Sequence, residues 1–255
     1  MSSYQSFVIS LKRANDRREH IKEQFASKNV AFDFFDAIEP STLKQSEFEF
    51  DISLDNSDLS ENEKSCFMSH FSLWNKALEE NLEYVAIFED DIYLSASSSV
   101  LLNSADWINA DFIKIEKTAK SVLLVDKKGY TFKNEKYKLG VLKNAHMGAG
   151  GYILSKKGLI NLITFIREQE RKDHIDQMMF DWFRKEGLIN IYQINPVICI
   201  QDCILYPDSQ KFQTSLQWRD KQKIKLNFIN KIKREVKRFI GKMLEFPYKI
   251  TLNFK

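Results

Sequence analysis

The N-terminal part of the chain alternates between short apolar runs and a polar segment with helical spacing. Residues 6–11 and 31–36 have the apolar character of strands. Between them, Asp16 and Glu19 have the spacing of a capping box, which predicts a helix to about residue 29. Two strands joined by one helix favour parallel pairing, so the pattern predicts a β-α-β unit.

The next hundred residues show the same alternation. Residues 40–60 are polar without a clear period, and we expect a loop there. Ser60 and Glu63 form a second capping box. The helix that follows places one apolar stripe at spacings of three and four, made of Phe67, Phe71, Trp74 and Leu78. The apolar run 84–88 is then expected to be a central strand.

The remaining pattern predicts further strands and two helices. Strands are expected at 112–116, 121–126, 130–133, 188–194 and 197–200, with a hairpin turn at residues 127–129. Ser155 can cap one helix, and another is expected from Ile175 to Glu186. Alternating strands and helices predict an α/β sheet domain over residues 1–218. Ligands in such sheets bind at the carboxyl ends of strands.

Charge divides the chain into two parts. The net charge is +3, but the segment from Arg219 to Lys255 holds twelve Lys/Arg and three Asp/Glu. Apolar positions with helical spacing alternate there with basic ones, which predicts a basic amphipathic helical tail over 219–255. Such a helix can lie on an anionic membrane surface. The alternatives are a helix packed on the body and a nucleic-acid-binding segment, for which the tail has few stacking aromatics.

The cysteine positions and the hydropathy of the chain indicate in which cellular compartment the protein is expected. No basic segment followed by an apolar stretch is visible after Met1, and no apolar run approaches the roughly 20 residues of a membrane span. Cys66, Cys199 and Cys203 cannot all pair with one another, which favours a reducing compartment. Cys199 and Cys203 lack a second Cys/His pair, which argues against a structural zinc site. We therefore expect a cytoplasmic protein, peripheral on the inner face of the plasma membrane.

The residues that most suggest chemistry are Glu89, Asp90 and Asp91, which directly follow the apolar run 84–88. Adjacent carboxylates repel one another unless a cation offsets their charge. Oxygen ligands suit Mn²⁺ or Mg²⁺ and a bound diphosphate. The alternative is a solvated acidic turn, but the position after a buried strand favours a metal site.

Several segments, in order along residues 5–205, resemble the motifs of glycosyltransferase family 25. They are Phe7–Leu11 with Arg17-Arg18, Phe34–Ile38, Ser65–His70, Ala86–Asp91, Gly148–Ser155 and Ile175–Gln177. Ser65 stands where the family pattern has Gly. The resemblance implies a GT-A-like (Rossmann-like) nucleotide-sugar-binding fold. It also implies inverting transfer of a hexose, often galactose from UDP-galactose, to a lipid-linked oligosaccharide of lipooligosaccharide or lipopolysaccharide.

The resemblance also assigns roles to residues. Asp91 is expected to bind the metal directly, with Asp90 or Glu89 touching the ribose or the metal. Independently of the resemblance, Gln201 and Asp202 follow the last expected strand and are candidates to complete the metal shell. The nucleotide-sugar donor is expected to contact Ser10, Leu11, Arg17, Asp36, Ala37, His70, Glu89, Asp90, Gly150, Gly151 and Gln177.

Inverting transfer needs one general base for the acceptor hydroxyl, and Asp176 is the candidate. Asp181 and Glu116 are alternatives. Several of these residues also have purely structural interpretations: a solvated Arg17, a structural His70, a carboxylate at a helix N-terminus for Asp176, and turn glycines at 150 and 151. An inactive, scaffolding member of the family is a further possibility, against which the retained acidic triplet argues.

Overall fold

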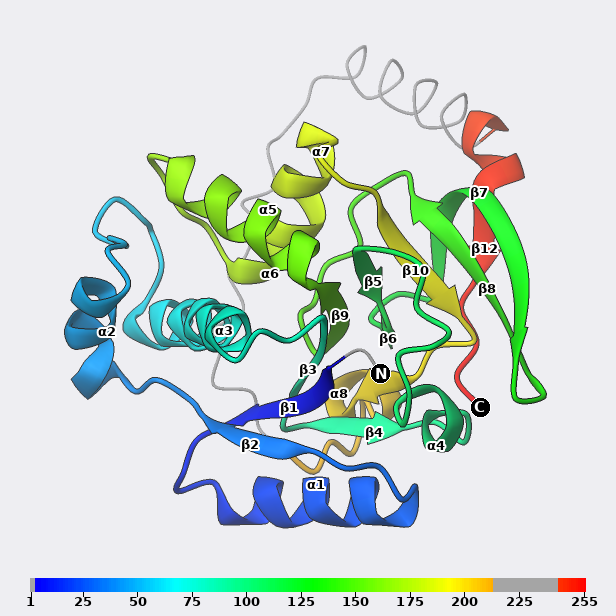
Figure 1. The fold of residues 1–255 in the computed structure, drawn as a ribbon, viewed down its shortest axis with the longest axis horizontal. Helices are drawn as coiled ribbons and strands as arrows, with labels where there is room; N and C mark the ends of the chain where they lie inside the picture. The colour runs from blue at the N-terminus through cyan, green and yellow to red at the C-terminus, as the bar shows by residue number, and fades with distance from the viewer. Residues whose placement is uncertain (1–2, 213–242) are drawn as a thin grey trace.

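A nine-stranded mixed sheet forms the centre of the protein. The computed structural model describes residues 3–212 and 243–255 (Figure 1). The strand order is β12-β7-β8-β10-β5-β9-β3-β1-β2. The strands are β1 (Tyr4–Ser10), β2 (Asp33–Asp36), β3 (Tyr84–Glu89), β5 (Phe112–Lys114), β7 (Ser121–Phe132), β8 (Glu135–Leu142), β9 (Gly151–Ser155), β10 (Ile191–Asn195) and β12 (Lys249–Thr251). The expected α/β fold class is confirmed.

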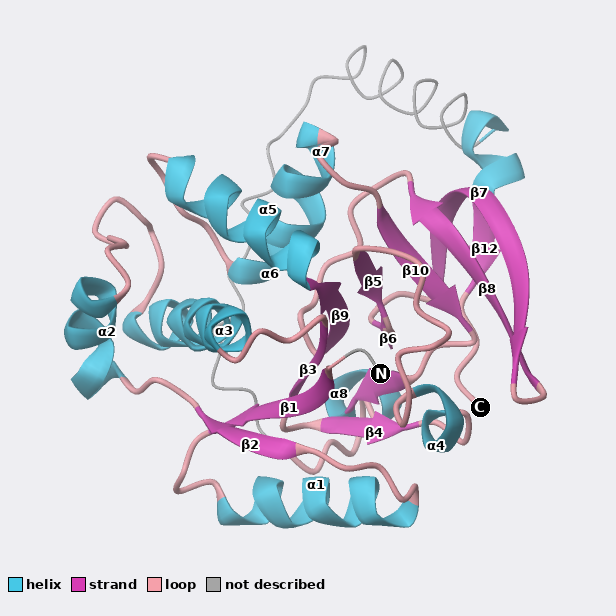
Figure 2. Cartoon of the chain, viewed as in Figure 1, coloured by secondary structure: helices cyan, strands magenta, loops and turns pink. Residues whose placement is uncertain are grey.

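Helices cover both faces of this sheet (Figure 2). One face carries α2 (Leu43–Glu49), α3 (Glu61–Glu79), α5 (Lys156–Glu168) and a continuous helical stretch made of α6 (Ile175–Gln177), η2 (Met178–Phe183) and α7 (Arg184–Glu186). The other face carries α1 (Asn15–Ser27) and α4 (Ser98–Leu101). Short elements complete the chain: η1 (Pro40–Thr42), α8 (Asp202–Leu205) and η3 (Phe246–Tyr248).

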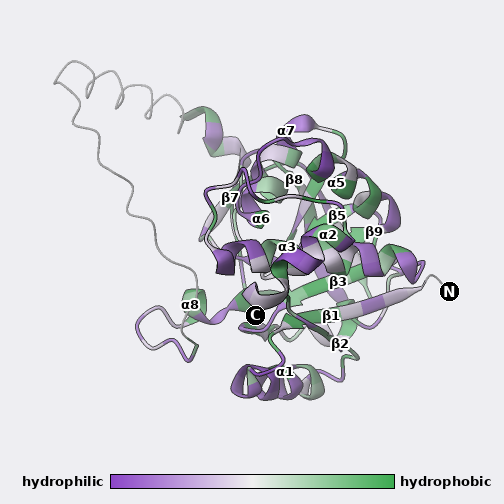
Figure 3. Ribbon diagram, turned by 90° about the vertical axis from the view of Figure 1, so that its left-hand side faces the viewer, coloured by the Kyte–Doolittle hydropathy of each residue, from purple (hydrophilic) through white to green (hydrophobic). Residues whose placement is uncertain are grey.

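The central strands are buried because they lie between these two layers. All five residues of β9 are buried, and so are four of the six in β3. In Figure 3, hydrophobic residues gather in the central strands, whereas α1 is largely hydrophilic. Such near-continuous apolar strands are typical of a sheet covered on both faces.

Strand direction gathers several chain segments at one edge of the sheet. Strand β1 is parallel to β2 and to β3, and β10 is parallel to β5. Strand β9 is antiparallel to both β3 and β5, so its first residue, Gly151, pairs with Phe88 near the end of β3. The carboxyl ends of β1, β3 and β5 therefore lie beside the start of β9, as expected for the ligand-binding edge.

A second, three-stranded sheet is formed by β4 (Ile92–Leu94), β11 (Cys199–Gln201) and β6 (Glu116–Lys117), with β11 in the middle. Strand β11 is antiparallel to β4, so Gln201 pairs with Ile92, directly after the acidic triplet. This small sheet brings a segment from late in the chain to the ends of β3 and β5.

The structure corrects three local predictions. The expected loop 40–60 contains η1 and α2. The expected turn at 127–129 lies inside β7, which bulges between Val125 and Lys128; the hairpin reverses at Lys133 and Asn134, both with positive φ. The capping box at Asp16 is absent, since α1 begins at Asn15 and its N-cap residue, Ala14, makes no side-chain hydrogen bond.

Most of the expected amphipathic tail lies outside the described residues. Its last part is described: β12 pairs with β7, and Leu252 is buried. The C-terminal residues thus contribute an edge strand to the main sheet. Within residues 3–212 and 243–255, no helix combines the length and the apolar character needed to cross a membrane.

Candidate active site

The acidic triplet lies in a tight turn between β3 and β4. The backbone N–H of Glu89 donates to the carbonyl of Gly150 (3.2 Å). The N–H of Asp202, at the start of α8, donates to the carbonyl of Asp91 (2.8 Å). The turn is thus fixed on one side by the glycine segment and on the other by the residue after β11.

Asp90 is held by two residues from the first β-α unit. Ser10 Oγ donates to Asp90 Oδ2 (2.7 Å), and Arg17 Nη1 donates to Asp90 Oδ1 (2.6 Å). Arg17 also lies 3.8 Å from Asp91 Oδ2. Ser10 ends β1 and Arg17 lies in the first turns of α1, so three predicted site residues meet here. Both carboxylate oxygens of Asp90 are occupied by these donors.

Gln201 joins the other two carboxylates. Its Nε2 donates to Glu89 Oε2 (2.8 Å) and lies 3.4 Å from Asp91 Oδ1. Since these residues are more than one hundred positions apart, the contact depends on β11 pairing with β4. The prediction that Gln201 lies at the acidic site is consistent with this geometry.

Burial and mutual repulsion raise the pKa of two carboxyl groups in the triplet. For Glu89, burial followed by the charges of Asp90 and Asp176 raises the pKa to about 7. For Asp91, burial and the charge of Glu89 raise the pKa to about 7, against the opposing charge of Arg17. The site therefore contains more negative charge than its own cations offset. A hard divalent cation would fit this oxygen-rich set, with Asp91, Glu89 and the amide oxygen of a rotated Gln201 as its candidate ligands.

His70 is buried behind Glu89. Its Nδ1 lies 2.7 Å from the hydroxyl of Tyr152, which also accepts a hydrogen bond from Trp74 Nε1 (2.9 Å). Its Nε2 lies 3.5 Å from Glu89 Oε1. Burial lowers the pKa of His70 to about 4, so the ring is neutral at neutral pH. His70 thus lies beside Glu89, on the interior side of the acidic cluster.

A buried ion pair supports the glycine segment. Lys114 Nζ donates to Glu116 Oε1 (2.6 Å), and both side chains are fully buried. The same carboxylate oxygen accepts from the N–H of Gly150 (3.1 Å). Burial raises the pKa of Glu116 to about 7, against the opposing charge of Lys114. Sequence reasoning missed Lys114, although a lysine inside the apolar run 112–115 was a visible signal.

The glycines at 150 and 151 are required by packing. Neither has positive φ; Gly148 does, at +97°. A Cβ at Gly151 would overlap Cys199 Sγ, and a Cβ at Gly150 would lie 2.7 Å from Glu116 Oε2 and 2.8 Å from Gln201 Cγ. The turn interpretation therefore applies to Gly148 and not to the two predicted site residues.

Asp176 connects the helical layer to the glycine segment. Its Oδ2 accepts from the N–H of Gly148 (2.9 Å), and its Oδ1 accepts from the N–H of Gln177 (2.8 Å). Its charge is close enough to raise the pKa of Glu89. Asp176 therefore lies near the acidic cluster, while Gln177 Nε2 donates to Asp181 Oδ2 (2.9 Å) along the helix.

The other residues predicted to contact the nucleotide-sugar donor are Leu11, Asp36 and Ala37, which lie on the rim of the same sheet edge. The carbonyl of Leu11 accepts from Arg18 Nε (3.1 Å), and the N–H of Ala37 donates to Ser10 O (2.9 Å). Asp36 is exposed and ion-paired with Arg18. Within the described ranges, none of these three residues makes a hydrogen bond or ion pair with the triplet.

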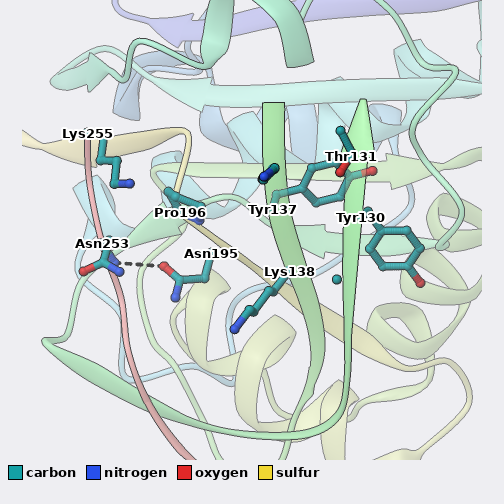
Figure 4. A pocket seen from close by; sticks show the side chains of 10 residues that line it. Tyr130, Thr131, Tyr137, Lys138, Asn195, Pro196, Asn253 and Lys255 are labelled. Carbon is teal, nitrogen blue, oxygen red and sulfur yellow. Dashed lines mark hydrogen bonds between the residues drawn. The ribbon is translucent and has the colours of Figure 1, made fainter. Parts of the chain in front are cut away.

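A separate hollow of about 470 Å³ lies beside β7, β8 and the C-terminal residues (Figure 4). Tyr137 and Lys138 of β8 line it together with Lys255, and Asn253 N donates to Asn195 Oδ1 (2.9 Å) at its border. No residue predicted for the site lines this hollow, so the functional assignment rests on the acidic cluster.

Comparisons with known proteins identify relatives. Residues 3–179 match the model of glycosyltransferase family 25 (LPS biosynthesis protein). A putative glycosyltransferase of Haemophilus influenzae is 36% identical over 255 residues, covering 96% of this chain and 88% of that protein. Lipooligosaccharide biosynthesis protein lic2B of Haemophilus influenzae is 34% identical, covering 83% and 81%.

Two further proteins are similar to this chain, one in sequence and one in structure. Lacto-N-neotetraose biosynthesis glycosyltransferase LgtE of Neisseria gonorrhoeae is 36% identical, covering 78% of this chain and 74% of that protein. Among solved structures, a glycosyltransferase involved in glycosylation of the major capsid of PBCV-1 is similar with a TM-score of 0.43 and 8% identity, covering 79% and 93%.

Proposed function

The chain belongs to glycosyltransferase family 25, and from this premise we propose that it transfers galactose from UDP-galactose, with inversion, to a lipid-linked oligosaccharide of lipooligosaccharide or lipopolysaccharide. The observation that carries the proposal is the cluster of Glu89, Asp91 and Gln201 at the carboxyl ends of the central strands. Its unbalanced negative charge suits a metal-bound diphosphate.

The donor would be held by residues from both halves of the site. Asp91 and Glu89, with Gln201, are proposed to hold Mn²⁺ or Mg²⁺, whose positive charge would stabilise the leaving diphosphate. Asp90, already occupied by Ser10 and Arg17, is proposed to fix the turn instead of serving as a primary ligand. Leu11, Asp36 and Ala37 would border the nucleotide on the rim.

The acceptor hydroxyl would be activated by a carboxylate. In an inverting transfer, the acceptor oxygen attacks the anomeric carbon, its proton passes to the base, and the bond to the diphosphate breaks. Asp176 is proposed as the base because it lies near the acidic cluster, at the junction of the helical layer and the glycine segment. Glu116 is less suited, because its side chain is fully buried and ion-paired with Lys114, whereas Asp176 is half-buried.

The experiment that tests this function is a screen of several UDP-sugars with the full-length protein, with and without Mn²⁺, followed by transfer to candidate acceptors. We expect the fastest hydrolysis for UDP-galactose, its loss on chelation, and its loss in Asp91→Ala. Full Mn²⁺-dependent turnover in Asp91→Ala would exclude the metal assignment. Faster turnover of another UDP-sugar would exclude galactose.

We also propose that the protein is cytoplasmic and binds the inner face of the plasma membrane through the basic segment 219–255. The support is the uneven charge of the sequence together with the lipid-linked acceptor. Sedimentation with anionic and with neutral vesicles tests it. Binding to anionic vesicles that falls with salt is expected, whereas tight RNA binding without vesicle binding would favour the nucleic-acid alternative.

A further inference from the structure

Three different metal-ligating side chains converge on the interior side of the acidic cluster. Cys66 and His70 lie four residues apart on α3 and therefore share one face of the helix. Glu89 ends β3 opposite this face. One ligating atom from each of the three residues lies within 4.8 Å of the others. This set contains sulfur, nitrogen and oxygen, unlike the oxygen-rich set formed with Asp91.

The imidazole of His70 provides an independent sign of a ligand. Its Nε2 is buried and has no hydrogen-bond partner among the residues that the structure describes. When Nδ1 carries the proton, it can donate to the hydroxyl of Tyr152, which lies 2.7 Å away. Nε2 then presents its lone pair toward Glu89. A metal-bound histidine usually donates its other ring N–H to an oxygen in this way.

The distances suit tetrahedral coordination. Zinc–nitrogen and zinc–oxygen bonds of about 2.0–2.2 Å place two tetrahedral ligands roughly 3.4 Å apart. His70 Nε2 and Glu89 Oε1 are already 3.5 Å apart. The three ligating atoms lie within 4.8 Å of one another. A tetrahedral sulfur–nitrogen pair lies roughly 3.5 Å apart, so the sulfur of Cys66 needs to approach by at most about 1.3 Å.

We propose that Cys66, His70 and Glu89 form a binding site for Zn²⁺ or a similar thiophilic divalent cation. Thiolate and imidazole ligands favour such ions over Mn²⁺ and Mg²⁺, which prefer oxygen. Three protein ligands leave a fourth position open for water or an anion. The site differs from the proposed manganese site in two of its ligands and shares Glu89 with it.

Sharing Glu89 makes the two cations competitors. A zinc ion bound through Glu89 Oε1, which faces His70, offsets the charge of the carboxylate whose Oε2 lies beside Gln201, and so weakens the attraction of that carboxylate for a second cation. Zn²⁺ is therefore expected to inhibit turnover in the presence of Mn²⁺. Inhibition rests on the proposed transferase function, whereas binding of the cation does not.

Cobalt titration of the full-length, reduced protein tests the site directly. Co²⁺ replaces zinc and reports a bound thiolate by a sulfur-to-cobalt charge-transfer absorption. We expect this absorption to saturate at one equivalent of Co²⁺ and to disappear when Zn²⁺ is added. Cys66→Ser and His70→Ala should each lose it. Cys203→Ser is the matched control, because this cysteine also lies near Asp91 but outside the cluster, and should retain the absorption.

The outcomes separate this site from the proposed function. Absence of the absorption in the unmodified protein, its persistence in Cys66→Ser, or its loss in Cys203→Ser overturns the site. Asp91→Asn should retain the absorption while losing Mn²⁺-dependent turnover. In the transferase assay, half-inhibition of Cys66→Ser should require at least tenfold more Zn²⁺ than half-inhibition of the unmodified protein. Each rate is expressed relative to that of the same protein without zinc. UDP-sugar turnover without a cobalt signal rejects only the cation site, and a cobalt signal without turnover rejects only the transferase.

Discussion

Arg17 Nη1 lies 2.6 Å from Asp90 Oδ1, which joins the first helix to the middle residue of the acidic triplet. Ser10 occupies the other carboxylate oxygen, so Asp90 is bound on both sides. Its neighbours Glu89 and Asp91 share the amide nitrogen of Gln201 on the other side of the turn. Adjacent carboxylates therefore have different tasks: Asp90 fixes the turn, and the other two present negative charge.

Replacing Asp90 by Asn should destabilise the protein. The change removes the carboxylate that accepts a charge-assisted hydrogen bond from Arg17, and losing a bond of this kind typically lowers the free energy of unfolding by about 1–3 kcal/mol. Urea unfolding measures the effect. Asp91→Asn is the matched control, since it removes negative charge from the same turn without removing the Asp90 partner of Arg17. Equal destabilisation by both changes would contradict the assignment of separate tasks.

Three carboxyl groups of the metal-free protein should contribute less to its stability as pH rises from about 4 to about 7, whereas His70 and His146, whose pKa values burial lowers to about 4 and about 3, contribute in the opposite direction. The folded pKa values of Glu89, Asp91 and Glu116 are raised to about 7 from ordinary values of 4.5, 3.8 and 4.5. An acid whose folded pKa is raised stabilises the fold fully below its unfolded pKa, and this contribution is lost as pH rises through the folded pKa.

Thermal unfolding at several pH values, with and without Mn²⁺, measures this dependence. Mn²⁺ should raise Tm most above pH 7, where the carboxylates are ionised, because it binds the folded state. Asp91→Asn should raise Tm of the metal-free protein at pH 8 by at least about 2 °C, the shift expected for 1 kcal/mol in a chain of this size. At pH 4 the same change should have little effect. A Tm difference between Asp91→Asn and the unmodified protein that does not grow between pH 4 and pH 8 contradicts the raised pKa of Asp91.

Gly151 should not tolerate even one methyl group. A Cβ there would overlap Cys199 Sγ, and overpacking of this kind usually costs about 1–3 kcal/mol of stability. Gly151→Ala should therefore lower the denaturant midpoint, and adding Cys199→Ala should recover part of the loss because it removes the sulfur. Gly129→Ala is the control, since nothing lies within 4 Å of a Cβ at that position. Additive effects of the two changes would show that the sulfur is not the obstacle.

Local signals in the sequence predicted those elements whose stabilising contacts are also local. The capping box at Ser60 forms because Ser60 and Glu63 bond one another's backbone, and the stripe it precedes is buried at Phe67, Phe71 and Trp74. At Asp16 the same spacing fails, since the helix already begins at Asn15. Helix α2 was missed because its sequence is polar; it is held by contacts with α3, from the next segment of the chain.

The site could be predicted only as far as residue types and their order indicate it. The triplet, Arg17, Ser10 and Gln201 were expected at one place, and the structure brings them into contact. The roles within it depend on contacts between distant segments, which no spacing rule specifies. Three contacts could be recognised only in the folded sheet. Hydrogen-bond donors enclose Asp90, and Lys114 supports the glycine segment through Glu116. His70 faces Glu89 from the interior.

Asp176 is the residue whose replacement should separate chemistry from binding. If it is the base, Asp176→Asn should lower kcat for transfer by about 10²–10⁴-fold, because proton transfer from the acceptor hydroxyl is lost. The asparagine oxygen can still accept from the N–H of Gly148, so UDP-sugar affinity and the unfolding midpoint should change little.

Asp181, five residues later in the same helical stretch, provides the matched control. It accepts from Gln177 Nε2 and Lys185 Nζ, and Asp181→Asn should retain most of the transfer rate. Glu116→Gln should behave differently from both, because it leaves the buried Lys114 without a charged partner and should lower the free energy of unfolding by about 3–5 kcal/mol. Steady-state transfer kinetics, donor titration and urea unfolding distinguish the three variants. Retained transfer in Asp176→Asn, together with its loss in Asp181→Asn, would assign the base to Asp181 instead.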